Sequence, residues 1–164
     1  MLKVNDYVRY GAKGIFKIIE IQKRKNKDNK KVNWYVLYSN SDGVDTKILT
    51  PADNPTLRKI MSKEEALEII EQMNDMEIIW DNNKRTRDEL FHDILASGDM
   101  KKMAQLMKSI YFIRYEKLQE GKDIAQIDKD VFNNAEKLLF EELSLSFDIQ
   151  KNEVLDFIMS KVTI

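Results

Sequence analysis

The residue types that carry most enzymatic chemistry are scarce in this sequence. It has no cysteine and a single histidine, His92, so it offers no thiolate and no histidine pair for a metal. His92 lies in a predicted helix between Phe91 and Asp93, which favours a surface or partly buried residue over a member of a Ser-His-Asp arrangement. Glu141 and Glu142 are adjacent carboxylates in a predicted helix, where neighbouring side chains point about 100° apart. A solvated helix face explains them better than a general acid-base pair. We therefore predict that the protein is not an enzyme.

Motifs for cofactors and metals are also missing. Neither G-x-x-x-x-G-K-[ST] nor G-x-G-x-x-G occurs, so no glycine loop is available to cradle a phosphate. Gly11 and Gly14 are typical of a turn between strands. Met100, Met103 and Met107 recur at helical spacing, which favours core packing over a flexible binding surface. We expect neither a cofactor nor a metal.

Basic residues interleaved with aromatic ones are the remaining pattern that points to a function. The first group combines three aromatic residues of a predicted strand with four nearby lysines: Trp34, Tyr35 and Tyr38 with Lys25, Lys27, Lys30 and Lys31. A barrel that binds single-stranded nucleic acid uses such a combination. The alternative, which we favour, is that half of the aromatic side chains face a core and the lysines keep a hairpin solvated.

A second basic group surrounds Trp80. Lys84, Arg85 and Arg87 follow it closely, and an exposed tryptophan beside arginines can wedge or stack at a DNA minor groove. The alternative is that Trp80 anchors a linker between two helices onto a bundle. These four residues are our candidate DNA contacts, with both interpretations open.

The elements that must position these residues change type along the chain. Residues 6–50 show alternating, β-branched segments separated by turns, which predicts a small antiparallel β-barrel. The predicted strands are Asp6–Tyr10, Ile15–Ile21, Val32–Tyr38 and Thr46–Thr50, with turns at 11–14, 27–29 and 39–43. Pro51 then ends this pattern.

Helical periodicity follows. Ser62-Lys63-Glu64-Glu65 has the form of a capping box, and it opens the first of five predicted helices. The later helices are expected at about Asn82–Ala96, Met100–Glu120, Asp128–Phe147 and Asn152–Lys161. The predicted fold class is therefore α+β, with an all-β domain over residues 1–55 and an all-α helical bundle over residues 56–164.

Charge separates the same two parts. Residues 1–60 hold 13 Lys and Arg against 6 Asp and Glu, a balance of +7, and the remainder carries −8. Such asymmetry is typical of two units with different partners. No apolar run approaches the ~18 residues that a membrane span needs, and no signal peptide is visible at the N-terminus. We expect a cytoplasmic protein that does not enter membranes and is monomeric when free.

Several segments, taken in order, resemble a known family. Residues 5–14 (NDYVRYGAKG) resemble its opening pattern, residues 34–37 (WYVL) its central strand, and residues 48–54 (ILTPADN) its passage from strand to linker. Residues 60–66 resemble the entry to its helical domain, and residues 95–99, 107–111 and 135–139 with 142–143 resemble its bundle. The family is the CarD family (the CarD/CdnL group) of bacterial transcription regulators, whose N-terminal module is shared with the transcription-repair coupling factor.

This resemblance implies a Tudor-like barrel that binds the β-subunit lobe of RNA polymerase by edge-to-edge strand addition. The matching docking strand is Thr46-Lys47-Ile48-Leu49-Thr50. Arg24 falls where relatives carry a polymerase-contacting arginine. A second such arginine, in the docking strand, is replaced here by Leu49.

The resemblance also implies a helical domain at the upstream edge of the promoter bubble, where a tryptophan of relatives slows bubble collapse. Counting back from Ser97-Gly98-Asp99 puts that position at about Lys84, and Trp80 lies one helical turn earlier. The expected function is thus a non-enzymatic regulator that binds RNA polymerase and modulates open-complex stability. The alternatives are a polymerase-docking adaptor without DNA contact and a barrel that binds single-stranded nucleic acid.

Overall fold

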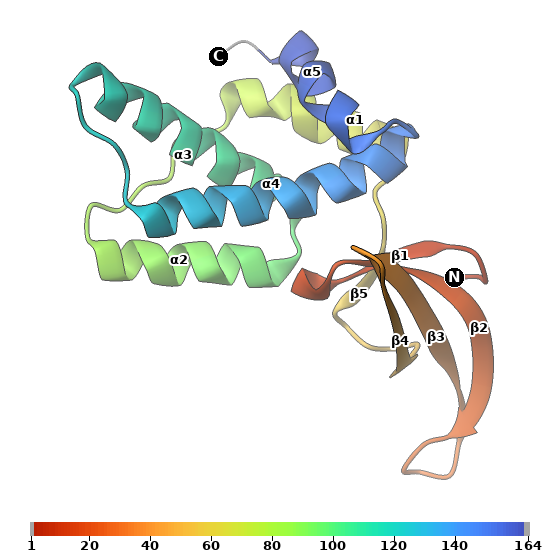
Figure 1. Cartoon of the computed structure of the whole chain (residues 1–164). Helices are drawn as coiled ribbons and strands as arrows, with labels where there is room; N and C mark the ends of the chain where they lie inside the picture. Colours follow the sequence, from red (N-terminus) through yellow and green to blue (C-terminus); the bar gives the residue numbers. More distant parts are fainter. Residues whose placement is uncertain (1, 163–164) are drawn as a thin grey trace. The chain divides into compact units, whose positions relative to one another are not determined.

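The computed structural model describes residues 2–162 and divides the chain into two compact units, Met1–Ile60 and Met61–Ile164 (Figure 1). Each unit has its own hydrophobic core, one among strands and the other among helices. The predicted α+β class, with strands first and helices after them, is confirmed. Among the described residues, no helix is both long enough and apolar enough to cross a membrane.

The first unit is a five-stranded antiparallel sheet. Its strands are β1 (Tyr7–Tyr10), β2 (Ile15–Lys25), β3 (Lys31–Ser41), β4 (Val44–Pro51) and β5 (Leu57–Lys59), and a 3-10 helix, η1 (Gly11–Lys13), joins β1 to β2. The strand order is β4-β3-β2-β1-β5. The expected closed barrel is not formed. Closure requires hydrogen bonds between the two edge strands, whereas the three-residue β5 pairs with β1 and β4 pairs with β3.

Tight turns set the register of the long strands. Asp42 and Gly43 both have positive φ, 53° and 78°, which identifies the two-residue type I′ turn that joins twisted antiparallel strands. In the β2–β3 turn, Asn26 Oδ1 accepts hydrogen bonds from the N–H groups of Asp28 and Lys30, at 3.0 and 2.9 Å. Both turns lie where the sequence predicted them.

The core of the sheet is small. It consists of Val8, Phe16, Ile18, Tyr35 and Leu37. The register between β2 and β3 shifts between Ile18 and Glu20, which is a β-bulge that bends the strand and increases its twist. All five core residues come from β1, β2 and β3, so β4 contributes mainly an edge.

The second unit is a bundle of five helices, all of them predicted. They are α1 (Lys63–Gln72), α2 (Lys84–Ser97), α3 (Met100–Gln119), α4 (Gln126–Phe147) and α5 (Lys151–Lys161), and a 3-10 turn, η2 (Met73–Asp75), extends α1. The longest helix, α4, contacts each of the other four and lies through the middle of the bundle (Figure 1). It therefore supplies the surface on which the others pack.

Local capping explains where these helices begin. The side chain of Ser62 accepts the backbone N–H of Glu65 at 3.1 Å, which is the serine half of the predicted capping box. Asn83 and Asp99 cap α2 and α3 in the same way. Gly98 ends α2 with φ of 68°, in the left-handed region that glycine adopts without strain.

A buried carboxylate fixes the start of the helical unit. Glu142 was expected on a solvated helix face, but it lies in α4 with no exposed surface. Its Oε2 accepts the backbone N–H of Met61 at 3.0 Å. Ser146, one turn further along α4, donates to the carbonyl of Met61 at 2.8 Å. Both backbone groups of Met61 are thereby satisfied in the interior, where an unpaired one would be costly.

Candidate docking edge and nucleic-acid interface

The predicted docking strand coincides with an edge strand. Thr46, Lys47, Ile48, Leu49 and Thr50 lie within β4, which pairs along its whole length with β3. On its other side, no strand among the described residues pairs with β4. This segment therefore presents a free edge of the kind that strand addition requires.

The hydrogen-bonding pattern shows which backbone groups of β4 face outward. In a two-residue hairpin the flanking residues, here Ser41 and Val44, form a hydrogen-bonded pair, and such pairs alternate along the ladder. The Ala52 N–H donates to the Asn33 carbonyl at 2.9 Å. Asn33 and Ala52 are therefore a hydrogen-bonded pair, as the alternation that starts at Ser41 and Val44 requires.

It follows that every second residue of β4 bonds to β3. Thr46, Ile48 and Thr50 belong to this class, with partners Ser39, Leu37 and Tyr35. The backbone N–H and C=O groups of Lys47 and Leu49 point away from the sheet. They are the groups that a partner strand would meet.

Side chains of the docking residues divide between the two faces of the sheet. Ile48 and Thr50 face the core, and Thr50 is 2% exposed. Leu49 is on the opposite face and is 39% exposed. The register Arg24↔Val32, Trp34↔Pro51 and Val36↔Leu49 places Arg24 on the same face as Leu49. Arg24 is exposed, and its Nε donates to Gln22 Oε1 at 2.9 Å.

The aromatic residues of β3 do not form an open stacking platform. Tyr35 is buried in the sheet core, while Trp34 and Tyr38 are half-buried on the other face. The Tyr38 hydroxyl donates to Asp45 at 2.7 Å, and this hydrogen bond raises the pKa of Tyr38 and lowers the pKa of Asp45. Tyr38 is thus engaged within its own hairpin.

In the helical unit, Trp80 lies in a linker without regular structure, residues 76–83. Four side chains of α2 and α3 hold this linker through its backbone. Lys108 Nζ donates to the carbonyl of Met76 at 2.9 Å, Gln105 to that of Glu77 at 3.0 Å, and Ser109 Oγ accepts the N–H of Ile79 at 2.9 Å. The fourth is Arg87, described below. The linker is therefore fixed to the bundle.

Trp80 is half-buried and packs against the bundle core. Its ring centroid is 6.0 Å from that of Phe91. The Arg87 guanidinium carbon lies 4.3 Å from the Trp80 ring centroid, and Lys117 Nζ lies 5.8 Å from it. These contacts are those of a packing residue that keeps part of its surface accessible.

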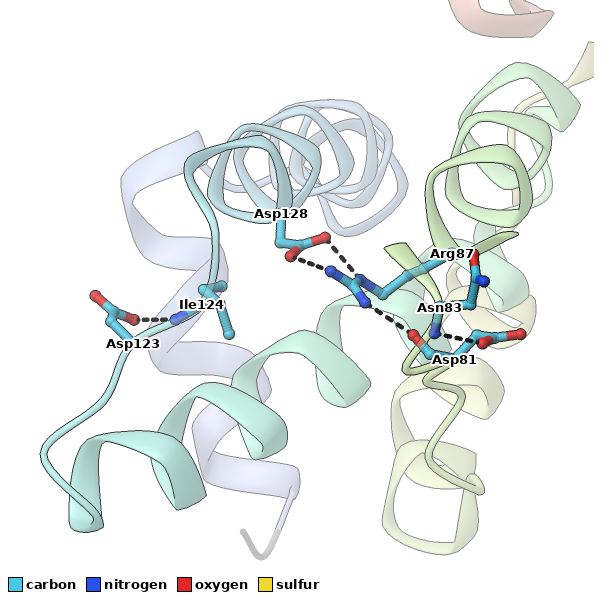
Figure 2. Close-up of polar contacts among 6 residues, drawn as sticks. All are labelled: Asp81, Asn83, Arg87, Asp123, Ile124 and Asp128. Atoms are coloured by element: carbon cyan, nitrogen blue, oxygen red, sulfur yellow. Dashed lines mark hydrogen bonds and ion pairs between the residues drawn. The ribbon is translucent and has the colours of Figure 1, made fainter. Parts of the chain in front are cut away.

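Arg87 was expected on the nucleic-acid surface, and its placement limits that role. Its side chain is 8% exposed and forms a two-pronged ion pair with Asp128, with Nε–Oδ1 of 3.1 Å and Nη2–Oδ2 of 3.0 Å. Arg87 Nη1 also donates to the Asp81 carbonyl at 2.8 Å (Figure 2). With its donors used inside the protein, Arg87 has little surface left for a phosphate. It positions the linker and Trp80 instead.

Lys84 and Arg85 are the accessible members of the basic group. They are the first two residues of α2 and are exposed. Arg85 forms only a solvent-exposed pair with Glu89, at 3.5 Å, of the kind that contributes little to stability. Their charges lie beside the N-terminus of a helix, where backbone N–H groups also favour anions.

Residues 65–159 match the family model described as CarD, C-terminal domain. This segment is more than half of the chain and contains Trp80, the linker that holds it and the basic residues of α2. The chain belongs to the CarD family. It is therefore a CarD-like regulator connected with transcription. A comparison with curated proteins found none that matches the chain.

The match to the CarD model covers residues 65–159 and does not include the sheet. The docking edge is supported by the geometry of β4 and by the resemblance of residues 5–14, 34–37 and 48–54 to the family. Within the matched domain, the Trp80 site also depends on residues that the sequence did not single out: Asp128, Gln105, Lys108 and Ser109. Asp128 is separated from Arg87 by 41 positions, and nothing in the local pattern pairs them. Nothing in the residues next to Lys108 marks it as a donor to this linker.

A second carboxylate near the start of α4 is held by cations. Asp123 accepts hydrogen bonds from Lys129 at 2.9 Å and Arg114 at 3.0 Å, and from the Ile124 N–H at 2.8 Å (Figure 2). The hydrogen bond from Lys129, together with those from Ile124 and Arg114, lowers the pKa of Asp123 to about 2. This cluster fixes the α3–α4 loop.

Proposed function

We propose that this CarD-family protein docks on the β-subunit lobe of bacterial RNA polymerase through β4 and contacts promoter DNA through the N-terminal end of α2. In this function it acts in the bacterial cytoplasm, as a monomer when free, and shifts the equilibrium between closed and open promoter complexes. It needs no catalytic residue for this, because contacts made only in the open complex suffice.

The observation that carries the docking proposal is the free edge of β4. Lys47 and Leu49 present outward backbone groups at the positions that the family resemblance assigns to docking. Strand addition draws its affinity from the backbone, so it tolerates leucine at position 49 in place of the arginine of relatives. Arg24, exposed on the same face as Leu49, supplies one charge on that face, although β3 separates its strand from the edge.

The DNA part of the proposal concerns Lys84, Arg85 and the accessible part of Trp80. The linker that carries Trp80 is fixed by Lys108, Arg87 and their partners, so its ring is presented without a further ordering cost. About 1.4 kcal/mol of stabilisation that is selective for the open complex changes the ratio of the two states about tenfold. A contact of two cations and one ring edge is sufficient for an effect of this size.

Docking is tested with a proline in the edge. Leu49→Pro removes an outward N–H but no bond of the β3–β4 ladder, and proline is tolerated on edge strands. A partner carbonyl left without its donor costs about 1–3 kcal/mol, so affinity of the full-length protein for a β-lobe fragment should fall about 5- to 150-fold. Leu49→Val, which keeps the N–H, is the matched control. Equal binding by both variants would refute strand addition at this edge.

The promoter contact is tested separately. Lys84→Gln combined with Arg85→Gln should leave lobe binding unchanged and shorten the lifetime of the open complex that polymerase forms with the protein. Lys137→Gln combined with Lys151→Gln, two exposed lysines elsewhere in the bundle, is the charge-matched control. If both pairs leave the lifetime unchanged while docking persists, the protein is an adaptor that acts without touching DNA.

A further inference from the structure

The β2–β3 hairpin extends beyond the rest of the sheet. β4 ends at Pro51, opposite Trp34, while β2 and β3 continue as a two-stranded ribbon with the pairs Lys23↔Asn33, Arg24↔Val32 and Lys25↔Lys31. Figure 1 shows this hairpin projecting from the sheet. We call residues 22–33 the basic ribbon.

The basic ribbon holds most of the positive charge of its unit. It contains six cations and one acid, a balance of +5 out of the +7 of residues 1–60: Lys23, Arg24, Lys25, Lys27, Lys30, Lys31 and Asp28. Among the described residues, none of its five lysines has an acidic partner, and Arg24 bonds to an uncharged amide. The protein thus leaves these charges available to an external anion.

The ribbon is ordered despite a repulsion built into it. Lys25 lies directly opposite Lys31, and like charges in this position destabilise a strand pair. The turn is nevertheless fixed by Asn26, whose side chain accepts two N–H groups and whose own N–H donates to the Lys30 carbonyl at 2.8 Å. These bonds fix the backbone of the turn, and the strand register sets the positions from which the cations project.

The two faces of the ribbon differ. Because side chains alternate along a strand, Lys23 and Lys25 share a face, and the register adds Lys31 to it. Arg24 lies on the opposite face, with Trp34. The lysine face (Lys23, Lys25 and Lys31) is thus separate from the face that carries Arg24 on β2 and Leu49 on β4.

We infer that the lysine face binds the phosphate backbone of duplex DNA. Neighbouring lysines on one strand are ~6.8 Å apart, and a two-stranded ribbon is narrow enough for the DNA major groove, which is ~12 Å wide. The centres of protein–protein interfaces are depleted in lysine and enriched in aromatic residues, so an acidic protein surface fits this face less well.

The position of the aromatic residues selects duplex over single-stranded nucleic acid. Binding of single strands relies on aromatic side chains that stack with bases beside the cations. Trp34 is on the other face of the ribbon, and Tyr35 is 5% exposed in the sheet core. The lysine face therefore offers charge without stacking, which suits backbone contacts that do not depend on sequence.

The ribbon site goes beyond the proposed docking and promoter contact, because it requires neither polymerase nor α2. The helical unit carries a balance of −8, which repels DNA at long range. For the free protein, the ribbon is therefore the part of the chain to which a duplex is drawn.

The test uses the full-length protein, a fluorescent 20-base-pair duplex of mixed sequence, and anisotropy titrations between 50 and 200 mM KCl. Lys23→Gln/Lys25→Gln/Lys31→Gln removes three cations from the ribbon. Lys101→Gln/Lys137→Gln/Lys151→Gln removes three exposed lysines from the bundle and changes the net charge equally. Far-UV circular dichroism with urea unfolding checks that both variants are folded.

Each phosphate contact adds about 0.9 to the slope of log affinity against log salt. The ribbon variant should therefore lose about 2.7 from this slope, so that the salt effect between 50 and 200 mM shrinks about 40-fold, while the bundle variant matches the wild type. Equal losses in both variants, or stronger binding of a single strand than of the duplex, would overturn the inference. So would a ribbon variant that loses β-lobe binding and keeps its DNA slope, because the partner would then be an acidic protein surface.

Discussion

Removing one partner of the buried Arg87–Asp128 pair should destabilise the helical unit strongly. Asp128→Ala leaves the Arg87 guanidinium, 8% exposed, without its counter-charge and with one remaining hydrogen bond, to the Asp81 carbonyl. Breaking a buried pair from one side costs about 3–5 kcal/mol. Because Arg87 also lies against the ring of Trp80, the same change should loosen the linker that presents this ring.

The assay is urea unfolding followed by far-UV circular dichroism, which reports mainly the helices, and by fluorescence of Trp80 in a Trp34→Phe background. The matched control is Arg85→Ala, two residues earlier in α2, where an exposed pair is worth about 0–0.5 kcal/mol. The double variant Arg87→Met/Asp128→Leu should cost less than Asp128→Ala, because no buried charge is left unpaired. A loss below about 1 kcal/mol for Asp128→Ala would refute the assignment of Arg87 to a structural role.

Three further outcomes follow from single contacts. Lys108→Met removes the donor to three carbonyls at the end of η2 and should cost about 2–3 kcal/mol in urea unfolding, a result contradicted if the midpoint does not move. Gly43→Ala puts a side chain at φ of 78° and should destabilise the sheet by about 1 kcal/mol, with Gly43→Asn milder. The pKa of Asp123 is lowered from 3.8 to about 2, so its stabilising contribution is present above about pH 4 and is lost as pH falls through about 2; a carboxyl titration by NMR with a midpoint near 4 would disprove the ion cluster.

Local signals explain how much of the fold was predictable. The capping residues Ser62, Asn83 and Asp99 mark the starts of α1, α2 and α3, and Gly98 marks the end of α2. The start of α4 has no side-chain cap, so that helix is indicated by its apolar periodicity alone. The strands and turns of the sheet also have local signals, namely alternating polar and apolar residues and the turn residues between them. Barrel closure was not predictable, because it depends on whether the two edge strands meet, and the short β5 that follows Pro51 carries almost no pattern of its own.

Each candidate site was likewise predictable from the sequence only in part. The edge position of β4 could be expected from the family resemblance, but the outward direction of the Lys47 and Leu49 backbone groups needs the register. Sequence proximity grouped Lys84, Arg85 and Arg87 as one basic patch. The structure separates them, because Lys84 and Arg85 are exposed whereas Arg87 is buried and pairs with Asp128 of α4. Asp128 is distant in the chain, and no local rule connects its carboxylate to Arg87.

The order in which the contacts form follows from the charges. Under the proposed function, a helical unit with a balance of −8 gains little from free DNA, so docking of β4 on polymerase would come first. Docking would then make the proposed contact of Lys84, Arg85 and Trp80 with a promoter effectively intramolecular. Tethering of this kind supplies an effective concentration in the millimolar range, which makes a weak contact sufficient. A promoter effect that depends on docking should therefore disappear in Leu49→Pro even though α2 is untouched, whereas duplex binding by the basic ribbon should persist in that variant. If Leu49→Pro abolished both, docking and duplex binding would share one surface. The conclusion that the lysine face of the ribbon is separate from the face that carries Arg24 and Leu49 would then be wrong.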